Sequence, residues 1–245
     1  MDEIKRLKEA ISESKKIVVF SGAGLSTNSG IPDFRSADGL YNQETGMNIR
    51  PEEIISHSFF LKNPDYFFSF YFDKMVYRDA KPNLAHKYFA KLEKEGKILA
   101  VVTQNIDNLH QLAGSKKVIE LHGSVERNYC MKCHKFYTLN EVYNEKHMIP
   151  HCSCGGIIKP DVVLYEENLD ENAIMQALDA ISNADMLIVV GTSLTVYPAA
   201  GFIRYFKGKN LVLLNKSETY YDSKATIAIH DDIKNVIEAL EKKDN

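Results

Sequence analysis

The chain of 245 residues has an ordinary globular composition, with 44% hydrophobic residues and a formal net charge of −3 at pH 7. This weak negative charge gives no field that would hold a nucleic acid or an anionic membrane, so we expect neither as a partner. No run approaches the roughly 18 apolar residues of a membrane-spanning helix, and the N-terminus is too charged for a signal peptide. We therefore expect a cytoplasmic protein.

The hydrophobic pattern predicts alternating helices and strands. Ile4, Leu7 and Ile11 have helical spacing, and an apolar strand follows over residues 17–20. Further strands are predicted at residues 98–103, 118–121, 161–165, 186–190, 211–214 and 225–229. Helices are predicted at residues 84–95, 171–181, 199–206 and 233–240. Continuous apolar strands with helical crossovers indicate the α/β class, a Rossmann-like and mostly parallel sheet whose ligand site lies at the carboxyl ends of its strands.

Two segments interrupt this alternation. Residues 38–82 contain helical patterns and many aromatic residues, and residues 125–157 contain all four cysteines. We predict that both are insertions that together form a smaller domain. Residues 1–37, 83–124 and 158–245 remain for the Rossmann-like domain, which the length of the chain can accommodate.

The end of the first strand carries the most informative segment. Gly22 and Gly24 let the backbone turn tightly and approach a ligand, as in folds that bind a dinucleotide pyrophosphate. The full G-x-G-x-x-G fingerprint is absent because Thr27 occupies the third glycine position. Instead, a loop broken by glycine and proline presents Phe34 and Arg35 beside the expected phosphate site. This departure argues against an ordinary dehydrogenase.

Polar residues follow several other predicted strands. They are Thr103 to Asp107, His122 to Ser124, Gly191 to Ser193 and Asn215 to Ser217. Taken singly, each is more typical of a turn or a helix cap than of catalysis. Parallel strands bring these ends to one crevice, where Asp107 can stabilise positive charge and His122 can transfer a proton near neutral pH.

The four cysteines have the spacing of a zinc site. Cys130 and Cys133 form one pair, and Cys152 and Cys154 form a second pair after an interval of eighteen residues. Four thiolates would close a tetrahedral coordination sphere, so one structural zinc ion per chain is predicted, and free thiols are the alternative. Disulfides are not expected in a reducing compartment.

The motifs together resemble the sirtuin family of NAD-dependent protein-lysine deacylases. The resemblance lies in GAGLSTNSGIPDFRS from Gly22, TQNID from Thr103, LHGS from Leu121, the four cysteines, KPDVVLYEE from Lys159 and GTSLTVYPAA from Gly191. It implies transfer of an acyl group from lysine to the ADP-ribose of NAD, with release of nicotinamide and formation of O-acyl-ADP-ribose.

The resemblance also implies roles for individual residues. His122 is implied to be the general base, and Asn105 and Asp107 are implied to act beside it in catalysis. The residues implied to contact NAD are Gly22, Ala23, Gly24, Thr27, Phe34, Arg35, Gln104, Asn105, Ile106, Asp107, His122, Gly191, Thr192, Ser193, Asn215, Lys216, Asp232 and Ile233. An acetyl-lysine protein or peptide is implied to bind as an extended strand against Val162, Val163, Leu164, Tyr165, Val196 and Tyr197. We expect a monomer.

The chain departs from the family pattern in two places. Glu166 stands where members usually carry glycine, which puts the local turn in doubt. The family branch that removes acidic acyl groups uses a Tyr-x-x-Arg pair, whereas this chain has Tyr71 and Lys74 at that spacing. We therefore expect small neutral acyl groups, chiefly acetyl.

Two other classes of protein remain as alternatives. A mono-ADP-ribosyltransferase would use the same NAD site but pass ADP-ribose to a protein side chain. A non-enzymatic module would only recognise a nucleotide or a partner. His122 together with Asn105 and Asp107 argues against the module, because a binding protein needs no base.

Overall fold

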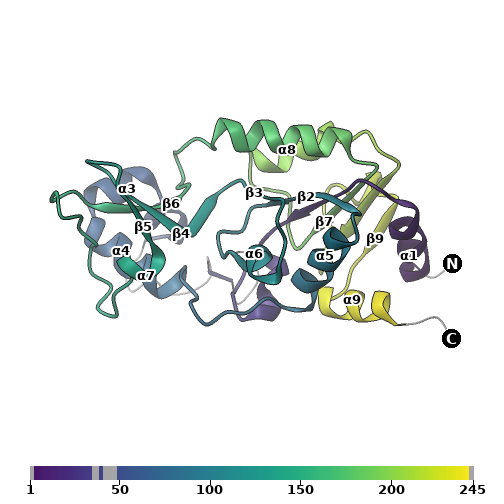
Figure 1. Cartoon of the computed structure of the whole chain (residues 1–245), viewed down its shortest axis with the longest axis horizontal. Helices are drawn as coiled ribbons and strands as arrows, with labels where there is room; N and C mark the ends of the chain where they lie inside the picture. Colours follow the sequence, from purple (N-terminus) through teal and green to yellow (C-terminus); the bar gives the residue numbers. More distant parts are fainter. Residues whose placement is uncertain (1–2, 35–38, 41–48, 243–245) are drawn as a thin grey trace.

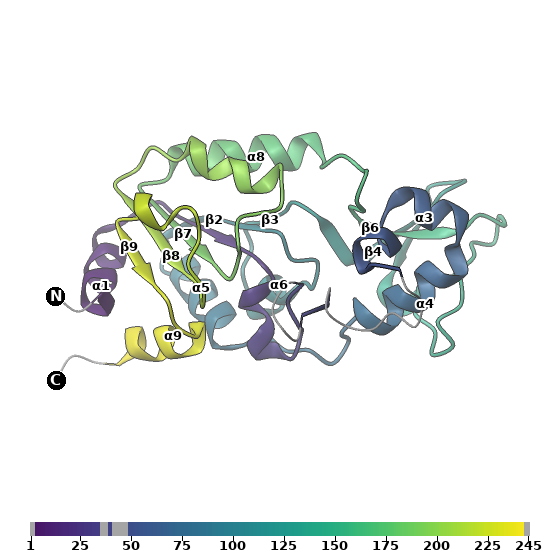
Figure 2. The same ribbon diagram turned by 180° about the vertical axis from the view of Figure 1, so that it is seen from behind.

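The computed structural model describes residues 3–34, 39–40 and 49–242. Over these ranges the chain forms an elongated molecule with a large sheet at one end and a small sheet at the other (Figure 1). The two termini lie near each other at the end that holds the large sheet (Figure 1, Figure 2). No helix in the described part of the chain is long and apolar enough to cross a membrane.

The large sheet has six strands in the order β3-β2-β1-β7-β8-β9, and every neighbouring pair is parallel. The strands are β1 (Ile17–Ser21), β2 (Ile98–Thr103), β3 (Val118–Glu120), β7 (Met186–Val190), β8 (Asn210–Leu214) and β9 (Ile227–Ile229). The chain runs outward from β1 through β2 to β3, and later outward from β7 through β8 to β9. The carboxyl ends of β1 and β7 therefore form the topological switch point, where open α/β sheets bind ligands.

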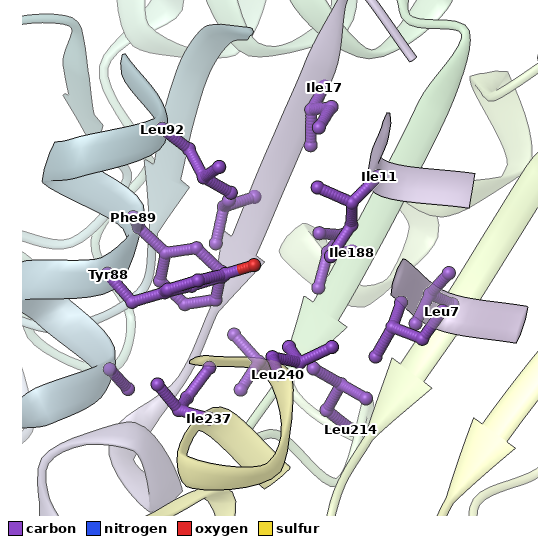
Figure 3. Packing of buried hydrophobic residues seen from close by; sticks show 14 of the residues in the cluster. Leu7, Ile11, Ile17, Tyr88, Phe89, Leu92, Ile188, Leu214, Ile237 and Leu240 are labelled. Atoms are coloured by element: carbon purple, nitrogen blue, oxygen red, sulfur yellow. The ribbon is translucent and has the colours of Figure 1, made fainter. Parts of the chain in front are cut away.

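Helices cover both faces of this sheet. Helices α1 (Glu3–Glu13), α5 (Leu84–Lys94) and α9 (Ile233–Glu241) lie on one face, and α8 (Glu171–Asn183) and the 3₁₀ helix η4 (Ala199–Tyr205) lie on the other. Strand β1 alternates between the two faces, since Ile17 and Val19 pack under α5 while Val18 and Phe20 pack under α8. Figure 3 shows the first core, where Tyr88, Phe89 and Leu92 of α5 meet residues of α1 and α9. The predicted doubly covered parallel sheet is confirmed.

The small lobe combines the two insertions. Its sheet has the order β5-β4-β6 and is antiparallel, with β4 (Gly123–Cys130), β5 (Phe136–Thr138) and β6 (Ile158–Val162). Helices α2 (Pro51–Ile54), α3 (His57–Lys62), α4 (Pro64–Lys74) and α7 (Leu139–Val142) complete it. One core joins the parts, because Phe60, Phe67 and Phe68 contact the cluster that contains Cys130 and Cys152.

One strand prediction is wrong. The strand expected at residues 161–165 runs instead from Ile158 to Val162 and pairs antiparallel with β4, so it belongs to the small sheet. Its residues alternate between buried and half-exposed, with Lys159 and Asp161 on the exposed side. That alternation is typical of a strand with one solvated face, whereas strands of a parallel sheet are buried on both faces. The assignment of residue ranges to two domains stays a prediction.

Candidate active site

A cavity of about 1030 Å³ lies at the carboxyl ends of the large sheet and reaches the small lobe. Its walls come from the loop after β1, with the 3₁₀ helices η1 (Ala23–Leu25) and η2 (Thr27–Ser29), from the segments after β2, β3, β7 and β8, and from the segment after β6. Pockets for ligands have volumes of about 300–1,000 Å³, so this cavity can hold a dinucleotide together with part of a second substrate.

Glycines let the loops after β1 and β7 touch at the switch point. A Cβ atom on Gly22 would lie 2.6 Å from Cβ of Thr192, and a Cβ on Gly24 would lie 2.9 Å from Cα of Gly191. Gly191 has a φ of +62°, and its own Cβ would lie 2.2 Å from the backbone nitrogen of Leu25. We expected Gly22 and Gly24 to serve the approach of a ligand. The structure shows that Gly22 and Gly24 are needed for the close contact between the two loops that line the cavity.

Asn105 and Asp107 are held by the loop after β1. The side-chain amide of Asn105 donates to the carbonyl oxygen of Gly22 at 3.1 Å and to Oγ of Ser26 at 3.2 Å. Ser26 in turn donates to Oδ2 of Asp107 at 2.6 Å, and the backbone N–H of Leu109 donates to Oδ1 at 2.9 Å. Burial raises the pKa of Asp107, and these two hydrogen bonds oppose that shift by stabilising the carboxylate. The three side chains form one connected, oriented set.

His122 lines the cavity, and one of its ring nitrogens is committed to a backbone hydrogen bond. Its Nδ1 lies 2.9 Å from the carbonyl oxygen of Gln104, which can only accept, so Nδ1 carries the proton and Nε2 is left as the acceptor. Burial lowers the pKa of His122, and the bond to Gln104 opposes this shift in part. The imidazole is therefore neutral at pH 7 and can take a proton at Nε2.

The structure brings together nearly all the site residues predicted from the sequence. Every residue predicted to contact the cofactor or the substrate lines this one cavity, apart from Arg35 and Asp232. Arg35 lies outside the described residues. Asp232 sits behind the wall, where its carboxylate accepts from Asn28 at 2.7 Å and pairs with Lys216 at 2.9 Å. Asp232 therefore supports Lys216, which does line the cavity.

Residues 162–165 form one wall and Val196 and Tyr197 form part of another. The backbone of this segment is anchored at both ends, since Val163 N–H donates to the carbonyl of His122 and Tyr165 pairs with the segment before α3. The carboxylate of Glu167 accepts from the backbone N–H of Leu164 at 2.8 Å. Burial raises the pKa of this carboxyl, but the N–H of Leu164 together with His57 and Lys159 lowers it on balance below the ordinary value. An extended chain can lie against this fixed segment.

The turn after this wall keeps a conformation that favours glycine although the residue is glutamate. Glu166 has a φ of +75°, in the left-handed region. Its carboxylate accepts from the backbone N–H of Ser58 at 2.8 Å and from Ser58 Oγ at 3.0 Å. These hydrogen bonds at the start of α3 compensate for the backbone strain. The turn therefore forms with glutamate at position 166.

Replacing Glu166 tests this balance. We expect Glu166→Gly to be more stable than Glu166→Ala by about 1 kcal/mol, because only glycine adopts a positive φ without strain. Urea unfolding at pH 7 measures the difference. Asn168 is the matched control, since its φ is not positive and alanine there should be at least as stable as glycine. Equal stabilities of the two Glu166 variants would contradict the strain.

Tyr71 and Lys74 do not form a joint site for an acidic acyl group. Tyr71 packs against Phe67 at a ring distance of 5.8 Å, and its hydroxyl is buried with no partner among the described residues. Burial raises its pKa. Lys74 lines the cavity and pairs with Asp73 at 3.0 Å, whereas Tyr71 is not among the described lining residues. The hydroxyl of Tyr71 and the cation of Lys74 are therefore not presented together.

The four cysteines converge as predicted. Their sulfur atoms all lie within 4.8 Å of one another, with 3.4 Å between Cys130 and Cys154 and 3.6 Å between Cys133 and Cys152. A tetrahedral ion with Zn–S bonds of about 2.3 Å needs S···S distances of about 3.8 Å, so the cluster fits a zinc ion. Backbone N–H groups of Lys132 and Cys154 point at these sulfurs. The spare donors His134 and His151 are not part of the cluster.

Sequence reasoning missed residues that hold the site without lining a strand end. Ser26 lies inside the glycine motif, but nothing in the sequence marks it as the partner of Asp107. Asn83 caps α5 and also donates to the carbonyl of Leu25 at 2.8 Å. An asparagine before a helical pattern is a recognised cap signal, so its place at the start of α5 could have been found, although its reach to the loop could not.

The protein has a polar crevice at the switch point of a parallel sheet, a neutral histidine in that crevice and a separate four-cysteine lobe. These features define an enzyme of the nucleotide-binding α/β class. A sequence model described as the Sir2 family matches residues 22–198. The chain belongs to the Sir2 family, which is the family its motifs resemble.

Related proteins cover nearly the whole chain. A protein of Clostridium perfringens is 59% identical over 96% of this chain and 97% of its own length, and one of Clostridium tetani is 58% identical over 97% and 96%. Both are named NAD-dependent protein deacetylase. A solved Sir2 structure with a p53 peptide and NAD⁺ is 42% identical, has a TM-score of 0.82 and covers 97% of this chain and 95% of its own. Another contains a deacetylated p53 peptide and 3′-O-acetyl ADP ribose, with 40% identity, a TM-score of 0.88 and coverage of 97% and 96%.

Proposed function

We propose that this chain is an NAD-dependent protein-lysine deacetylase that releases nicotinamide, free lysine and O-acetyl-ADP-ribose. The observation that carries the proposal is His122, a partly buried neutral imidazole that lines the same cavity as Asn105 and Asp107 and has Nε2 as its proton acceptor. The names of the curated relatives favour deacetylation over mono-ADP-ribosyl transfer. A module that only binds would not need a base in this position.

We assign the half of the cavity at the switch point to NAD. When bound, NAD supplies an ADP-ribosyl group with nicotinamide as its leaving group. The segment of residues 22–34, named here the cofactor loop, would cover it, with Phe34 excluding water from one face. Asn105 and Asp107 would orient the nicotinamide ribose, since their side chains are fixed by hydrogen bonds before the ligand arrives. Thr192, Ser193, Asn215 and Lys216 would contact the phosphates and the adenosine half.

We assign His122 the role of general base. Its Nε2 would accept a proton from a ribose hydroxyl, which then attacks the acyl group. The bond from Nδ1 to Gln104 fixes the ring orientation and the tautomer throughout. Nearby residues 162–165, with Val196 and Tyr197, would bind the peptide as an added strand, so that main-chain hydrogen bonds provide affinity with little sequence selectivity. The peptide bound to related Sir2 structures supports this assignment.

One product analysis tests the function. We expect an acetyl-lysine peptide to be deacetylated only when NAD is added, with one O-acetyl-ADP-ribose and one nicotinamide formed per peptide, measured by mass spectrometry. Label transferred from NAD to protein, without O-acetyl-ADP-ribose, would instead identify an ADP-ribosyltransferase. Deacetylation that persists after complete removal of NAD would overturn the proposal.

The acyl preference is a separate prediction. We expect kcat/KM for an acetyl-lysine peptide to exceed that for the matching succinyl-lysine peptide by about tenfold or more, because a carboxylate is costly to bury where no Tyr-x-x-Arg pair receives it. The physical reason is the burial of the Tyr71 hydroxyl away from Lys74. Propionyl-lysine serves as the control for acyl size. A faster reaction on the succinyl peptide would contradict this preference.

We further propose that the protein acts in the cytoplasm as a monomer and does not bind nucleic acid. The formal net charge of −3 and the absence of a spanning helix among the described residues support this setting. Sedimentation of the purified protein, with and without duplex DNA, tests the last two statements.

A further inference from the structure

Two histidines are buried together outside the cavity. His86 on α5 is 0% exposed and His110 on α6 (Leu109–Ala113) is 1% exposed. Their ring centroids lie 4.9 Å apart with an angle of 69° between the planes. Nε2 of His86 and Nδ1 of His110 have no hydrogen-bond partner among the described residues. Buried polar atoms without partners are costly, so the pair calls for a physical reason.

The surrounding hydrogen bonds determine which nitrogen of each ring carries the proton. The backbone N–H of Asn83 donates to Nδ1 of His86 at 3.3 Å, which leaves the proton of that ring on Nε2. Ser21 Oγ donates its one proton to Thr103 Oγ1 at 2.9 Å, so its 3.0 Å bond to Nε2 of His110 uses the N–H of the ring. His110 therefore has an acceptor at Nδ1, and His86 has a donor at Nε2.

Both rings are neutral at pH 7, as this pattern requires. Burial lowers the pKa of His86 to about 4 and the pKa of His110 to about 3, and the neighbouring His86 adds to the shift of His110. Each neutral ring has one donor and one acceptor. The two unpartnered atoms are thus complementary.

We propose that Nε2–H of His86 donates to Nδ1 of His110 through one buried water, and that the two rings are positioning residues which join the cofactor loop to Asn105. The link completes an unbroken hydrogen-bond chain across four elements. In order, it runs through Asn83, His86, His110, Ser21, Thr103 and Asn105.

Both ends of this chain reach the walls of the cavity. At one end, the side chain of Asn83 donates to the carbonyl of Leu25 at 2.8 Å and to Ser29 Oγ at 3.0 Å, which holds the cofactor loop. At the other end, Thr103 Oγ1 accepts from the backbone N–H of Asn105 at 3.0 Å. The proposal rests on the assignment of this cavity to NAD. A break in the chain should therefore loosen the NAD site from two sides.

Affinity for NAD tests the chain without any catalytic readout. We expect His86→Phe and His110→Phe, which keep an aromatic ring and remove the nitrogens, each to raise the Kd for NAD by about tenfold in calorimetry. The double variant should be no weaker than the weaker single variant, because one break already interrupts the chain. Leu92→Ala is the control, since Leu92 is buried on the same helix as His86 but makes no bond in the chain.

The outcomes separate positioning from packing. Single variants that lower Tm as Leu92→Ala does, while NAD affinity stays within twofold, would overturn the proposal. Effects of the two single variants that multiply in the double variant would overturn it as well, since they would act independently.

The wild-type protein provides a second test, which remains valid even where a substituted variant does not fold. Ring ¹⁵N spectra should show both histidines as Nε2–H tautomers, with slow solvent exchange of the His86 ring proton. A proton on Nδ1 of His110 would reverse the chain and overturn the proposal. Failure of the wild-type protein to bind NAD would instead refute the proposed function. The tautomers measured in the ¹⁵N spectra would then still test the hydrogen-bond chain.

Discussion

Replacing His122 by alanine should reduce kcat for deacetylation by about 10²–10⁴-fold, the range expected when a general base is removed. NAD binding should remain measurable, because the other residues that line the cavity are unchanged. The reason is the geometry of the ring, whose Nδ1 is committed to Gln104 and whose Nε2 is therefore the one proton acceptor it can offer. Steady-state kinetics with an acetyl-lysine peptide, together with calorimetry for NAD, measure the two effects separately.

The matched control for this substitution is His147→Ala. His147 belongs to the small lobe, contacts the rings of Phe72 and Tyr143, and is not among the described residues that line the cavity. Its loss should leave kcat within twofold of the wild type. Turnover of His122→Ala equal to that of the control would show that the imidazole is not the base.

The pH profile follows from the same imidazole. The pKa of His122 is lowered by burial, and its neutral form is the active one. Activity should therefore be level above pH 7 and should fall with acid, with a midpoint in kcat/KM below the ordinary histidine value of about 6.5. A midpoint above that value would mean that a neighbouring negative charge, and not desolvation, dominates the environment of the ring.

The large sheet could be predicted because its strands are buried on both faces and so read as continuous apolar runs. Residues 98–103 and 186–190 were predicted with the bounds that β2 and β7 have in the structure. The parallel arrangement then predicts where the polar segments after the strands meet, which places Asn105, His122 and Thr192 in one crevice. In this part of the chain, local pattern and global fold agree.

Strand β6 could not be assigned to its sheet in the same way. Its alternation of buried and half-exposed residues identifies a strand with one solvated face. This pattern does not indicate which other strand β6 pairs with. The partner is decided by packing against the aromatic residues of α4, such as Phe67 and Phe68, which are far away in sequence. Spacing alone did predict the cysteine cluster, because metal coordination imposes its geometry on the sequence.

The hydrogen bonds that support the site could not be predicted from the sequence, for a related reason. Ser26 and Asp107 are 81 residues apart, and Ser21 and His110 are 89 residues apart. Nothing in the local sequence marks Ser21 or Ser26 as the partner of a side chain so far along the chain. Their pairing exists only because β1, β2 and α6 meet at one edge of the fold, so it becomes visible with the three-dimensional arrangement.

Removal of zinc should strongly lower the thermal stability of the protein. We expect one zinc ion per chain in the purified protein, and we expect chelation or Cys152→Ser to lower Tm by about 10 °C or more. The physical reason is that Cys130 and Cys152 belong to the core shared by both insertions, so the ion holds together the small lobe as a whole. Elemental analysis and thermal unfolding, followed by circular dichroism, measure the two quantities. Ser153→Ala, between two of the ligands, is the control and should retain both zinc and Tm.

The same loss should reach catalysis through the backbone of His122. Strand β4 begins at Gly123, the next residue, and the carbonyl of His122 accepts from Val163 N–H just beyond β6 at 3.0 Å. Disorder in the small sheet therefore releases His122, whereas Gly22, Gly191 and Asn215 stay fixed by the large sheet. Zinc-depleted protein should lose deacetylation by 100-fold or more while its Kd for NAD rises by less than about tenfold. Full turnover without zinc would separate the small lobe from the geometry of the base and contradict this coupling.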